Sequence, residues 1–215
     1  MLLQTEIFNL IGKQLIFLLV LKEPQKLKEL KELFIVEATK NQVFPLDNTL
    51  SYRLGIPRPS LTAGKNRFTY LKPLTGIPLG DAPNILNKSF SIEAKVDMPE
   101  KADGVLLTQG GRFGGFGLYL LKGKPVFVYN LLDLKRVRWE GKEEIAPGKH
   151  TLVFELDYDG PGLGKGASGR LLVDGKEVAS QKLEHTIPFI LQWDETFDIG
   201  SDTGTPVDDN DYKLP

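Results

Sequence analysis

A glycine-rich run at residues 110–117, Gly-Gly-Arg-Phe-Gly-Gly-Phe-Gly, places the strongest constraint on how this chain can fold. Glycine lets a backbone turn sharply or lie close to another backbone, because it has no Cβ atom. The stretches 104–109 and 125–130 on either side are typical of strands, and Lys122-Gly123-Lys124 is typical of a hairpin turn with positive φ at Gly123. We therefore expect three adjacent antiparallel strands in the middle of a sheet, with the glycines where side chains of a facing sheet approach.

The composition sets further limits on function. The 215 residues correspond to one or two domains, and an apolar content of 41% is enough for a hydrophobic core. The formal net charge of −1 gives no overall field that would attract nucleic acid or an acidic membrane. The absence of cysteine excludes disulfides, zinc sites with thiolate ligands and a cysteine nucleophile.

Residues 1–43 are expected to form an N-terminal apolar segment followed by an amphipathic helix. The apolar stretch 15–21 is shorter than the ~20 residues of a membrane-spanning helix, and no small-x-small cleavage site follows it. We interpret it as a buried segment, neither a membrane span nor a signal peptide, which leaves the localisation open between cytoplasmic and exported. From Pro24 to about Asn41, apolar residues recur at helical spacing, which predicts a helix packed on a neighbour. The apolar stripe consists of Leu27, Leu30, Leu33, Phe34 and Ala38.

Residues 44–88 are expected to form an ordered, extended strap across a protein surface. Prolines recur at positions 45, 57, 59, 73, 78 and 83, and this density excludes a long helix or a central strand. The segment is nevertheless too apolar for a flexible linker. Its large apolar residues are Phe44, Leu46, Leu54, Phe68, Tyr70, Leu71 and Leu74.

Residues 89–215 are expected to form a β-sandwich. Apolar and polar residues alternate over 89–96, which is typical of a strand with one buried face. Asp174-Gly175 is a strong signal for a two-residue hairpin. Further strands are expected at 135–139, 151–157, 170–173, 177–179, 189–191 and 197–199, before an acidic, turn-like tail from residue 200. The predicted fold class is mainly β: an antiparallel, jelly-roll-like sandwich of the concanavalin or laminin-G kind, with an N-terminal helix and a strap.

Carboxylates supply the best candidates for a binding site. Seven of them, with neither lysine nor arginine, lie from Asp194 to Asp211. Calcium prefers hard oxygen ligands, which loops at the rim of a sandwich can supply. The candidate calcium ligands are Asp157, Asp159, Asp194, Asp198 and Asp202. A solvated acidic surface is the alternative interpretation. No catalytic residue and no required cofactor are predicted.

Three other patterns favour structural roles. The stretch 162–166, Gly-Leu-Gly-Lys-Gly, lacks the spacing of a phosphate-binding loop and is interpreted as a turn. His150 and His185 are the only histidines, and no nucleophile elbow anchors a Ser-His-Asp triad. The basic residues at 135–138, before Trp139, are expected on an edge strand, where charge prevents sheets from pairing. An anion or a nucleic-acid base is the alternative partner for them.

Several ordered stretches resemble the C-terminal region of bacterial-type arylsulfatases, over residues 24 to 213. These stretches are 24–30, 43–47, 58–64, 68–70, 82–85, 88–92, 109–115, 129–130, 157–166, 194–198 and 202–206. The resemblance implies an accessory domain of a sulfate-ester hydrolase, with a sulfatase catalytic domain as its partner. The family signature, a cysteine or serine before x-Pro-x-Arg that becomes formylglycine, is absent. The acidic calcium cluster and the catalytic lysine and histidines of the family also have no counterparts, so this chain alone is expected to be inactive.

The resemblance further implies a truncated chain. In the resembled family, the residues matching 211–215 continue into one more apolar strand, so the sandwich is expected to lack its last strand and to self-associate. Residues 11–21 also depart from the family, which is polar and acidic there.

A free carbohydrate-binding module is the alternative function, because sandwiches often bind sugars through exposed aromatic side chains. The candidates are Tyr119, Trp139, Tyr158 and Trp193. An exposed aromatic row beside a groove would favour sugar binding. An apolar surface beside the strap would favour docking to a catalytic domain.

Overall fold

The structure is a computed structural model that describes residues 22–46, 61–189, 191 and 194–213. The chain forms two compact units, residues 1–58 and residues 59–215. The apolar segment predicted at residues 15–21 lies outside the described residues.

The first unit contains helix α2 (Pro24–Lys40), which begins at the predicted proline and ends just before Asn41. Proline suits the first turn of a helix, where an N–H group has no intrahelical partner. Within α2, Ala38 is buried, whereas Leu30 and Phe34 of the predicted apolar stripe are exposed. Among the described residues, no helix is both long and apolar enough to cross a membrane.

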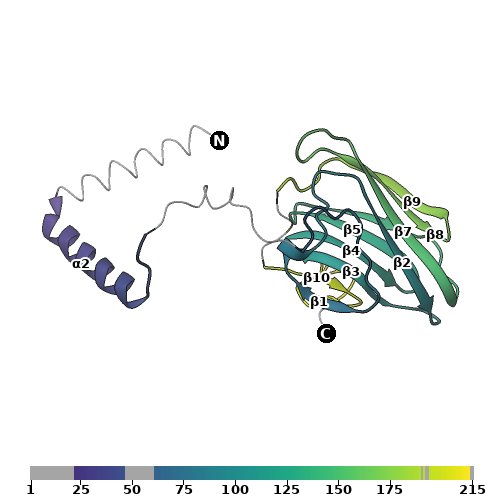
Figure 1. Cartoon of the computed structure of the whole chain (residues 1–215), viewed down its shortest axis with the longest axis horizontal. Helices are drawn as coiled ribbons and strands as arrows, with labels where there is room; N and C mark the ends of the chain where they lie inside the picture. The colour runs from purple at the N-terminus through teal and green to yellow at the C-terminus, as the bar shows by residue number, and fades with distance from the viewer. Residues whose placement is uncertain (1–21, 47–60, 190, 192–193, 214–215) are drawn as a thin grey trace. The chain divides into compact units, whose positions relative to one another are not determined.

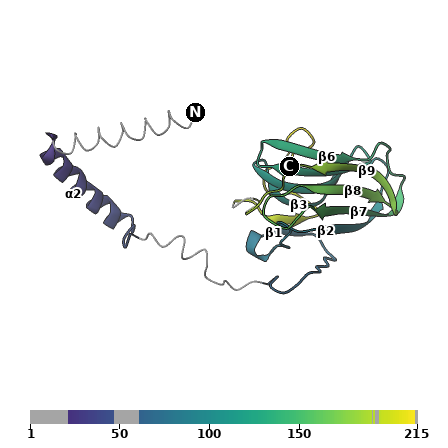
Figure 2. The same ribbon diagram turned by 90° about the horizontal axis from the view of Figure 1, so that it is seen from above.

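The second unit consists of two antiparallel sheets, which confirms the mainly β prediction (Figures 1 and 2). The six-stranded sheet has the order β1 (Leu74–Ile77), β10 (Phe197–Ile199), β3 (Gly104–Gly111), β4 (Gly114–Leu121), β5 (Lys124–Leu131) and β6 (Lys135–Glu140). The four-stranded sheet has the order β2 (Phe90–Met98), β7 (Gly148–Tyr158), β8 (Ala167–Val173) and β9 (Lys176–Leu183). The predicted central strands β3, β4 and β5 are confirmed. Positive φ angles at Gly123 and Gly175 confirm the two predicted hairpin turns.

Part of the predicted strap belongs to the six-stranded sheet. β1 lies at its edge and pairs with β10, with a shift of register between Leu74 and Ile77. The second unit therefore includes part of the predicted strap together with the predicted sandwich. A proline-rich segment can supply an edge strand, because only one side of such a strand takes part in the hydrogen-bond ladder.

The strand predicted at residues 189–191 is not formed. Phe189 and Leu191 lie in bends that follow Pro188, and residue 190 lies outside the described residues. Leu191 is buried, and its carbonyl oxygen would be 2.8 Å from a Cβ atom at Gly114. Leu191 therefore lies against the β3–β4 turn, and neither Phe189 nor Leu191 belongs to a strand.

The glycine-rich run is close-packed for a different reason from the one predicted. A Cβ atom at Gly110 or Gly115 would overlap the backbone of the neighbouring strand in the β3–β4 pair. A Cβ atom at Gly111 would overlap Thr205 of the C-terminal segment. Neighbouring backbone and the C-terminal segment, not side chains of the facing sheet, therefore require glycine in this run.

Aromatic side chains from both sheets form the centre of the core. Phe127 of β5 stacks on Phe154 of β7 with ring centroids 3.4 Å apart, and Trp139 of β6 meets Phe154 edge-on at 5.1 Å. The indole N–H group of Trp139 donates to the carbonyl oxygen of Gly169 at 2.8 Å. A Cβ atom at Gly169 would lie 2.6 Å from the indole ring, so only glycine fits at this position of β8.

Replacement of Gly169 by alanine is expected to lower the free energy of unfolding by about 1–3 kcal/mol, because the new methyl group overpacks the core against Trp139. Ser168→Ala, at the exposed position before it on β8, is the matched control and should change this free energy by less than about 0.5 kcal/mol. Urea unfolding of both variants measures the effect. Equal midpoints for the two variants would contradict the role assigned to Gly169.

Candidate functional site

A pocket of about 470 Å³ lies in the second unit, beside the strap. Its lining comes from residues 62–65 and Phe68 of the strap, from Leu79 and Gly80 of the short 3₁₀ helix η1 (Leu79–Asp81), and from residues 82–86 and Lys88. Gln109 near the end of β3 also lines it, with Phe189 and Leu191. The volume falls within the range of small-molecule sites in proteins.

Gln109 contributes an unused polar group to this pocket. The residue is only 3% exposed, and its Oε1 atom has no hydrogen-bond partner among the described residues. Its partners in the ladder, Phe116 on β4 and Phe197 on β10, are both buried and apolar. Gln109 therefore occupies a position at which packing alone would favour an apolar side chain. Burial of an unpaired amide oxygen costs about 1–3 kcal/mol.

Two lysines give the pocket positive charge. Lys65 and Lys88 are both exposed lining residues, and neither forms an ion pair with a described residue. The described lining contains no aspartate or glutamate. Apolar side chains such as Phe68, Ile85 and Leu191 complete the lining. The lining thus combines two exposed lysines, apolar side chains and one unpaired amide oxygen.

Asn87 fixes the segments that border the pocket. Its Nδ2 atom donates to the Pro188 carbonyl at 2.6 Å, and its Oδ1 atom accepts from the Gly164 N–H group at 2.8 Å and lies 3.2 Å from the Tyr158 hydroxyl oxygen. The φ angle of Asn87 is 55°, in the left-handed region that asparagine adopts more readily than most residues. These bonds join the end of the strap to the β7–β8 loop and to the chain just before Phe189.

The five predicted calcium ligands are not brought into one group. Asp157 is exposed on β7, Asp194 is exposed, and Asp159 forms an ion pair with Lys182 at 3.2 Å. Asp198 and Asp202 lie on or after β10 and are buried. Within the described residues, no three or more histidine, cysteine, aspartate or glutamate side chains are arranged to hold a metal ion. Calcium binding by these residues therefore stays a prediction.

Asp198 acts as an internal hydrogen-bond acceptor. Its Oδ1 atom accepts from the Gly76 N–H group at 2.6 Å and its Oδ2 atom from the Thr203 N–H group at 2.8 Å and the Thr203 hydroxyl at 2.6 Å. Burial acts to raise the pKa of Asp198, but these hydrogen bonds outweigh it and hold the pKa below its usual value. The donors point their hydrogen atoms at the carboxylate, which fits an anion held by the fold and does not fit a bound cation. The carboxylate joins β1, β10 and the C-terminal segment.

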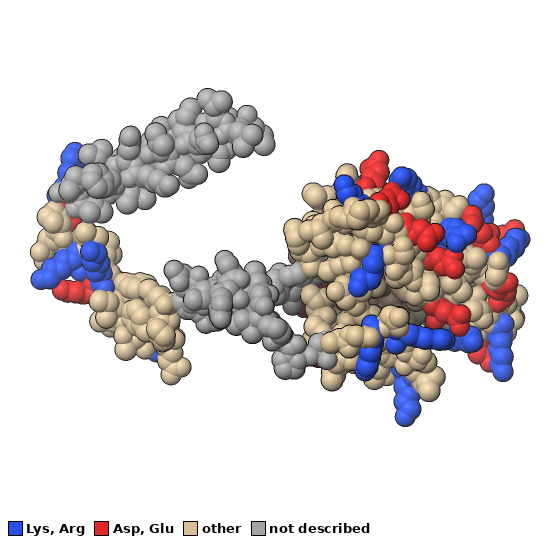
Figure 3. All heavy atoms as spheres, turned by 45° about the horizontal axis from the view of Figure 1, so that its top comes forward, with Lys and Arg blue, Asp and Glu red and all other residues tan. Residues whose placement is uncertain are grey.

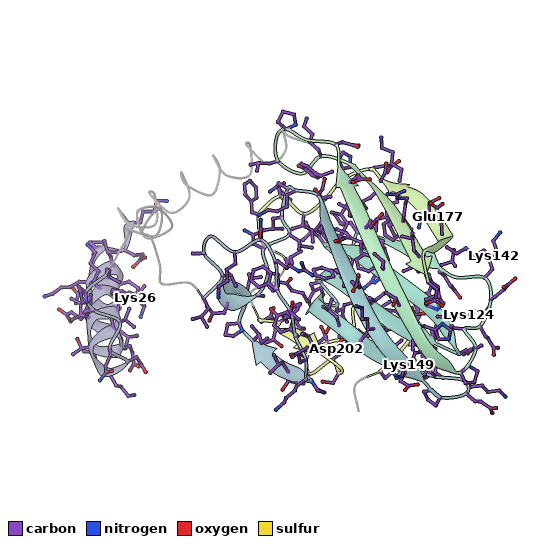
Figure 4. All side chains as sticks on the ribbon, turned by 45° about the vertical axis from the view of Figure 1, so that its right-hand side comes forward. Lys26, Lys124, Lys142, Lys149, Glu177 and Asp202 are labelled. Atoms are coloured by element: carbon purple, nitrogen blue, oxygen red, sulfur yellow. The ribbon has the colours of Figure 1, made fainter. Side chains whose placement is uncertain are left out.

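Asp202 has a different electrostatic environment, and Figure 4 shows it close to β10. It accepts from the Tyr212 hydroxyl at 2.6 Å and from the Gly204 N–H group at 3.1 Å. Burial raises the pKa of Asp202, and repulsion from Glu195 and Asp198 adds to the increase. The two neighbouring carboxyl groups thus have pKa values shifted in opposite directions.

The aromatic residues predicted to contact sugar have other roles. Trp139 is in the core, and Tyr119 is buried where its hydroxyl donates to Asp211 and its ring meets Tyr212. Tyr158 is half-buried and its hydroxyl donates to the Gly162 carbonyl at 2.6 Å. Trp193 lies outside the described residues. Neither Tyr119 nor Trp139 can therefore belong to an exposed aromatic row.

The basic residues before Trp139 lie on an edge strand, as predicted, because β6 ends the six-stranded sheet. Arg136 pairs with Asp133 at 2.7 Å, and Arg138 pairs with Glu140 at 2.8 Å and also with Asp211. Positive and negative side chains intermix on the face of this unit that Figure 3 shows. The structure thus gives these arginines acidic partners within the chain.

His150 joins the start of β7 to the β8–β9 turn. Its Nδ1 atom lies 2.7 Å from Asp174 in the β8–β9 turn, and its Nε2 atom lies 2.8 Å from the Ala146 carbonyl. The hydrogen bond to Asp174 raises the pKa of His150 and outweighs the opposing effect of burial, and the hydrogen bond with the Ala146 carbonyl adds a smaller increase. Both ring nitrogens are therefore engaged in structural contacts.

Comparisons of the chain with protein-family models and with curated proteins give no match. The resemblance to arylsulfatases therefore stays a prediction. The pocket was not predicted from the sequence, although one signal for it exists. Gln109 is the polar residue between an apolar strand and the glycine-rich run, opposite the inward-facing Phe116.

Replacement of Asp198 by asparagine is expected to lower the free energy of unfolding by about 2 kcal/mol, because an amide cannot accept every bond that the carboxylate accepts. Asp202→Asn is the matched control. An amide there still accepts from Gly204 and donates to the Tyr212 oxygen, so a change within about 0.5 kcal/mol is expected. Denaturant unfolding at neutral pH measures both variants, and equal losses would contradict the distinction. Because the pKa of Asp198 is lowered from 3.8, its contribution is present above pH 3.8 and is lost as the pH falls through the folded-state pKa.

A titration of His150 followed by NMR is expected to give a pKa above 6.5, the ordinary value for histidine. Asp174→Asn should move this pKa back toward 6.5, because it removes the negative partner. The raised pKa means that the contribution of His150 to stability is fully present below pH 6.5 and is lost as the pH rises through the folded-state pKa. An identical titration curve in Asp174→Asn would show that this ion pair does not form in solution.

Proposed function

We propose that this chain is the C-terminal accessory domain of a sulfatase-type (arylsulfatase) hydrolase of sulfate esters, and that it docks on a catalytic domain without catalysing the reaction itself. The stretches that resemble this family support the proposal. Two of them, residues 109–115 and 202–206, are in contact, because the Arg112 N–H group donates to the Thr205 hydroxyl at 2.9 Å. The resemblance thus extends to two distant stretches that pack together.

The proposal includes the finer fold, a jelly-roll-like sandwich of the concanavalin or laminin-G kind. The strand order supports it. The first and last strands pair with each other, and the chain passes from one sheet to the other after β1, β2, β6 and β9. Repeated crossing between two antiparallel sheets is characteristic of jelly rolls.

An apolar rim at the glycine-rich end of the six-stranded sheet is the observation that carries the docking proposal. The rim consists of Phe113 in the β3–β4 turn, Leu132 and Leu134 in the β5–β6 turn, and Phe189, all exposed. Leu134 is 84% exposed and Phe189 is 71% exposed. Large apolar side chains that are grouped and exposed mark interaction surfaces more often than scattered ones do.

Asn130 holds the two turns of the rim together. It is fully buried, its Nδ2 atom donates to the carbonyls of Gly111 at 2.8 Å and Arg112 at 2.7 Å, and its Oδ1 atom accepts from the Asp133 N–H group at 3.0 Å. The rim is therefore built on a fixed backbone. A preformed apolar surface loses little conformational entropy when a partner binds it.

The docking proposal predicts that the full chain binds an arylsulfatase catalytic region from which the C-terminal sandwich has been removed. Leu134→Glu should weaken this association about tenfold or more, because it places a charge in the apolar contact. Lys142→Glu, on the β6–β7 connection at the other end of β6, is the control and should leave the affinity unchanged (Figure 4). Sedimentation velocity of the mixture measures the association.

The same preparation tests the catalytic part of the proposal. The chain alone should not hydrolyse an aryl sulfate, with calcium supplied, because it lacks the residue that becomes formylglycine. Turnover that survives repeated purification would contradict the proposal. Self-association of the chain through Leu134, without binding to the catalytic region, would show that the rim joins two copies of this chain instead.

A free carbohydrate-binding module is the second candidate function. The pocket at Gln109 favours it, since this pocket offers an unpaired amide and apolar walls to a small polar ligand. Sugar would then bind at the pocket and not on the buried Tyr119 and Trp139.

A further inference from the structure

We propose that the pocket at Gln109 binds an acidic sugar, that is, a polyhydroxylated ring that carries one anionic group. The proposal rests on the Gln109 amide, on Lys65 and Lys88, and on the size of the pocket. It does not depend on docking to a catalytic domain, because the apolar rim takes no part in it except through Phe189.

The Gln109 amide is suited to pair with a hydroxyl group of the ligand. Its Oε1 atom is buried without a hydrogen-bond partner, in a residue that lines the pocket. An amide presents one acceptor and one donor, which exchange places when the amide group rotates. A hydroxyl group both donates and accepts, so it can pair with the amide in either orientation. A purely apolar ligand would leave the amide unpaired and would retain the cost of its burial.

The rest of the lining favours a ligand that carries negative charge and has a ring with apolar faces. Lys65 and Lys88 supply two positive charges, and the described lining supplies no negative one. Phe68 and Phe189 add aromatic rings to the lining, on which the C–H face of a sugar can lie. The volume of about 470 Å³ exceeds that of one monosaccharide, which leaves room for a second ring or for water.

Binding is measured on the full chain by isothermal titration and by chemical-shift changes in its amide spectrum. The probes are glucuronate, glucose 6-phosphate, glucose and inorganic phosphate. Glucuronate or glucose 6-phosphate should bind saturably, and glucose should bind about tenfold more weakly because it lacks the charge. A preference between the two acidic sugars identifies the anionic group, carboxylate or phosphate.

Variants locate the site. Gln109→Met keeps the length of the side chain and removes its hydrogen bonds, and should weaken both the acidic sugar and glucose about tenfold. The double substitution Lys65→Gln with Lys88→Gln should weaken only the acidic sugar, again about tenfold. Lys142→Gln is the control and should change neither affinity.

Three results would overturn the proposal. The first is no saturable binding of any probe to the unmodified chain. The second is inorganic phosphate binding as tightly as the acidic sugars, which would reduce the pocket to an anion site. The third is an unchanged affinity in the double lysine variant. Because both lysines are exposed, this last result would be decisive even if Gln109→Met failed to fold.

Discussion

The contact between Trp139, Phe154 and Gly169 is the constraint on which the rest of the second unit depends. It draws β6, an edge strand of one sheet, against the centre of the other sheet. With β6 fixed, the β5–β6 turn lies beside the β3–β4 turn, and buried Asn130 bonds both. Asn130 thus fixes the backbone of the apolar rim, while one glycine on β8 leaves room for the indole ring of Trp139 on β6.

The acidic C-terminal segment stabilises the outer side of the six-stranded sheet. Val207 packs on Tyr119, Val126 and Val128, which face away from the aromatic core. The surrounding carboxylates accept hydrogen bonds from backbone N–H groups and hydroxyls, as Asp198 does from Gly76 and Thr203. Carboxylates can satisfy donors where a segment without strands covers a sheet, because each oxygen accepts more than one bond. The acidic residues of this segment therefore satisfy backbone donors and also pair with Arg112 and Arg138 on the sheet.

The sequence predicted those parts of the fold that follow from local chemistry. The central hairpins follow from Gly123 and Gly175, and helix α2 follows from Pro24 and the helical spacing after it. The pairing of β1 with β10 joins residues far apart in the chain, so no local pattern could predict it. The same limit applies to the site. Gln109 is a polar residue at the end of an apolar strand, but only the packing of residues 62–65, Phe68 and Leu191 beside it forms a pocket.

Two unpaired polar atoms lie on neighbouring residues of β3, but only one of these residues lines the pocket. Thr108 Oγ1 and Gln109 Oε1 are both buried without hydrogen-bond partners among the described residues. Successive side chains of a strand point to opposite faces of the sheet. Thr108, which pairs with Asp198 and Gly117, does not line the pocket, whereas Gln109 does. A ligand can therefore supply the missing hydrogen bond to Gln109 alone. A methionine or leucine at position 109 would fill the same space without the cost of an unpaired amide oxygen, so packing does not account for glutamine, whereas the proposed ligand would.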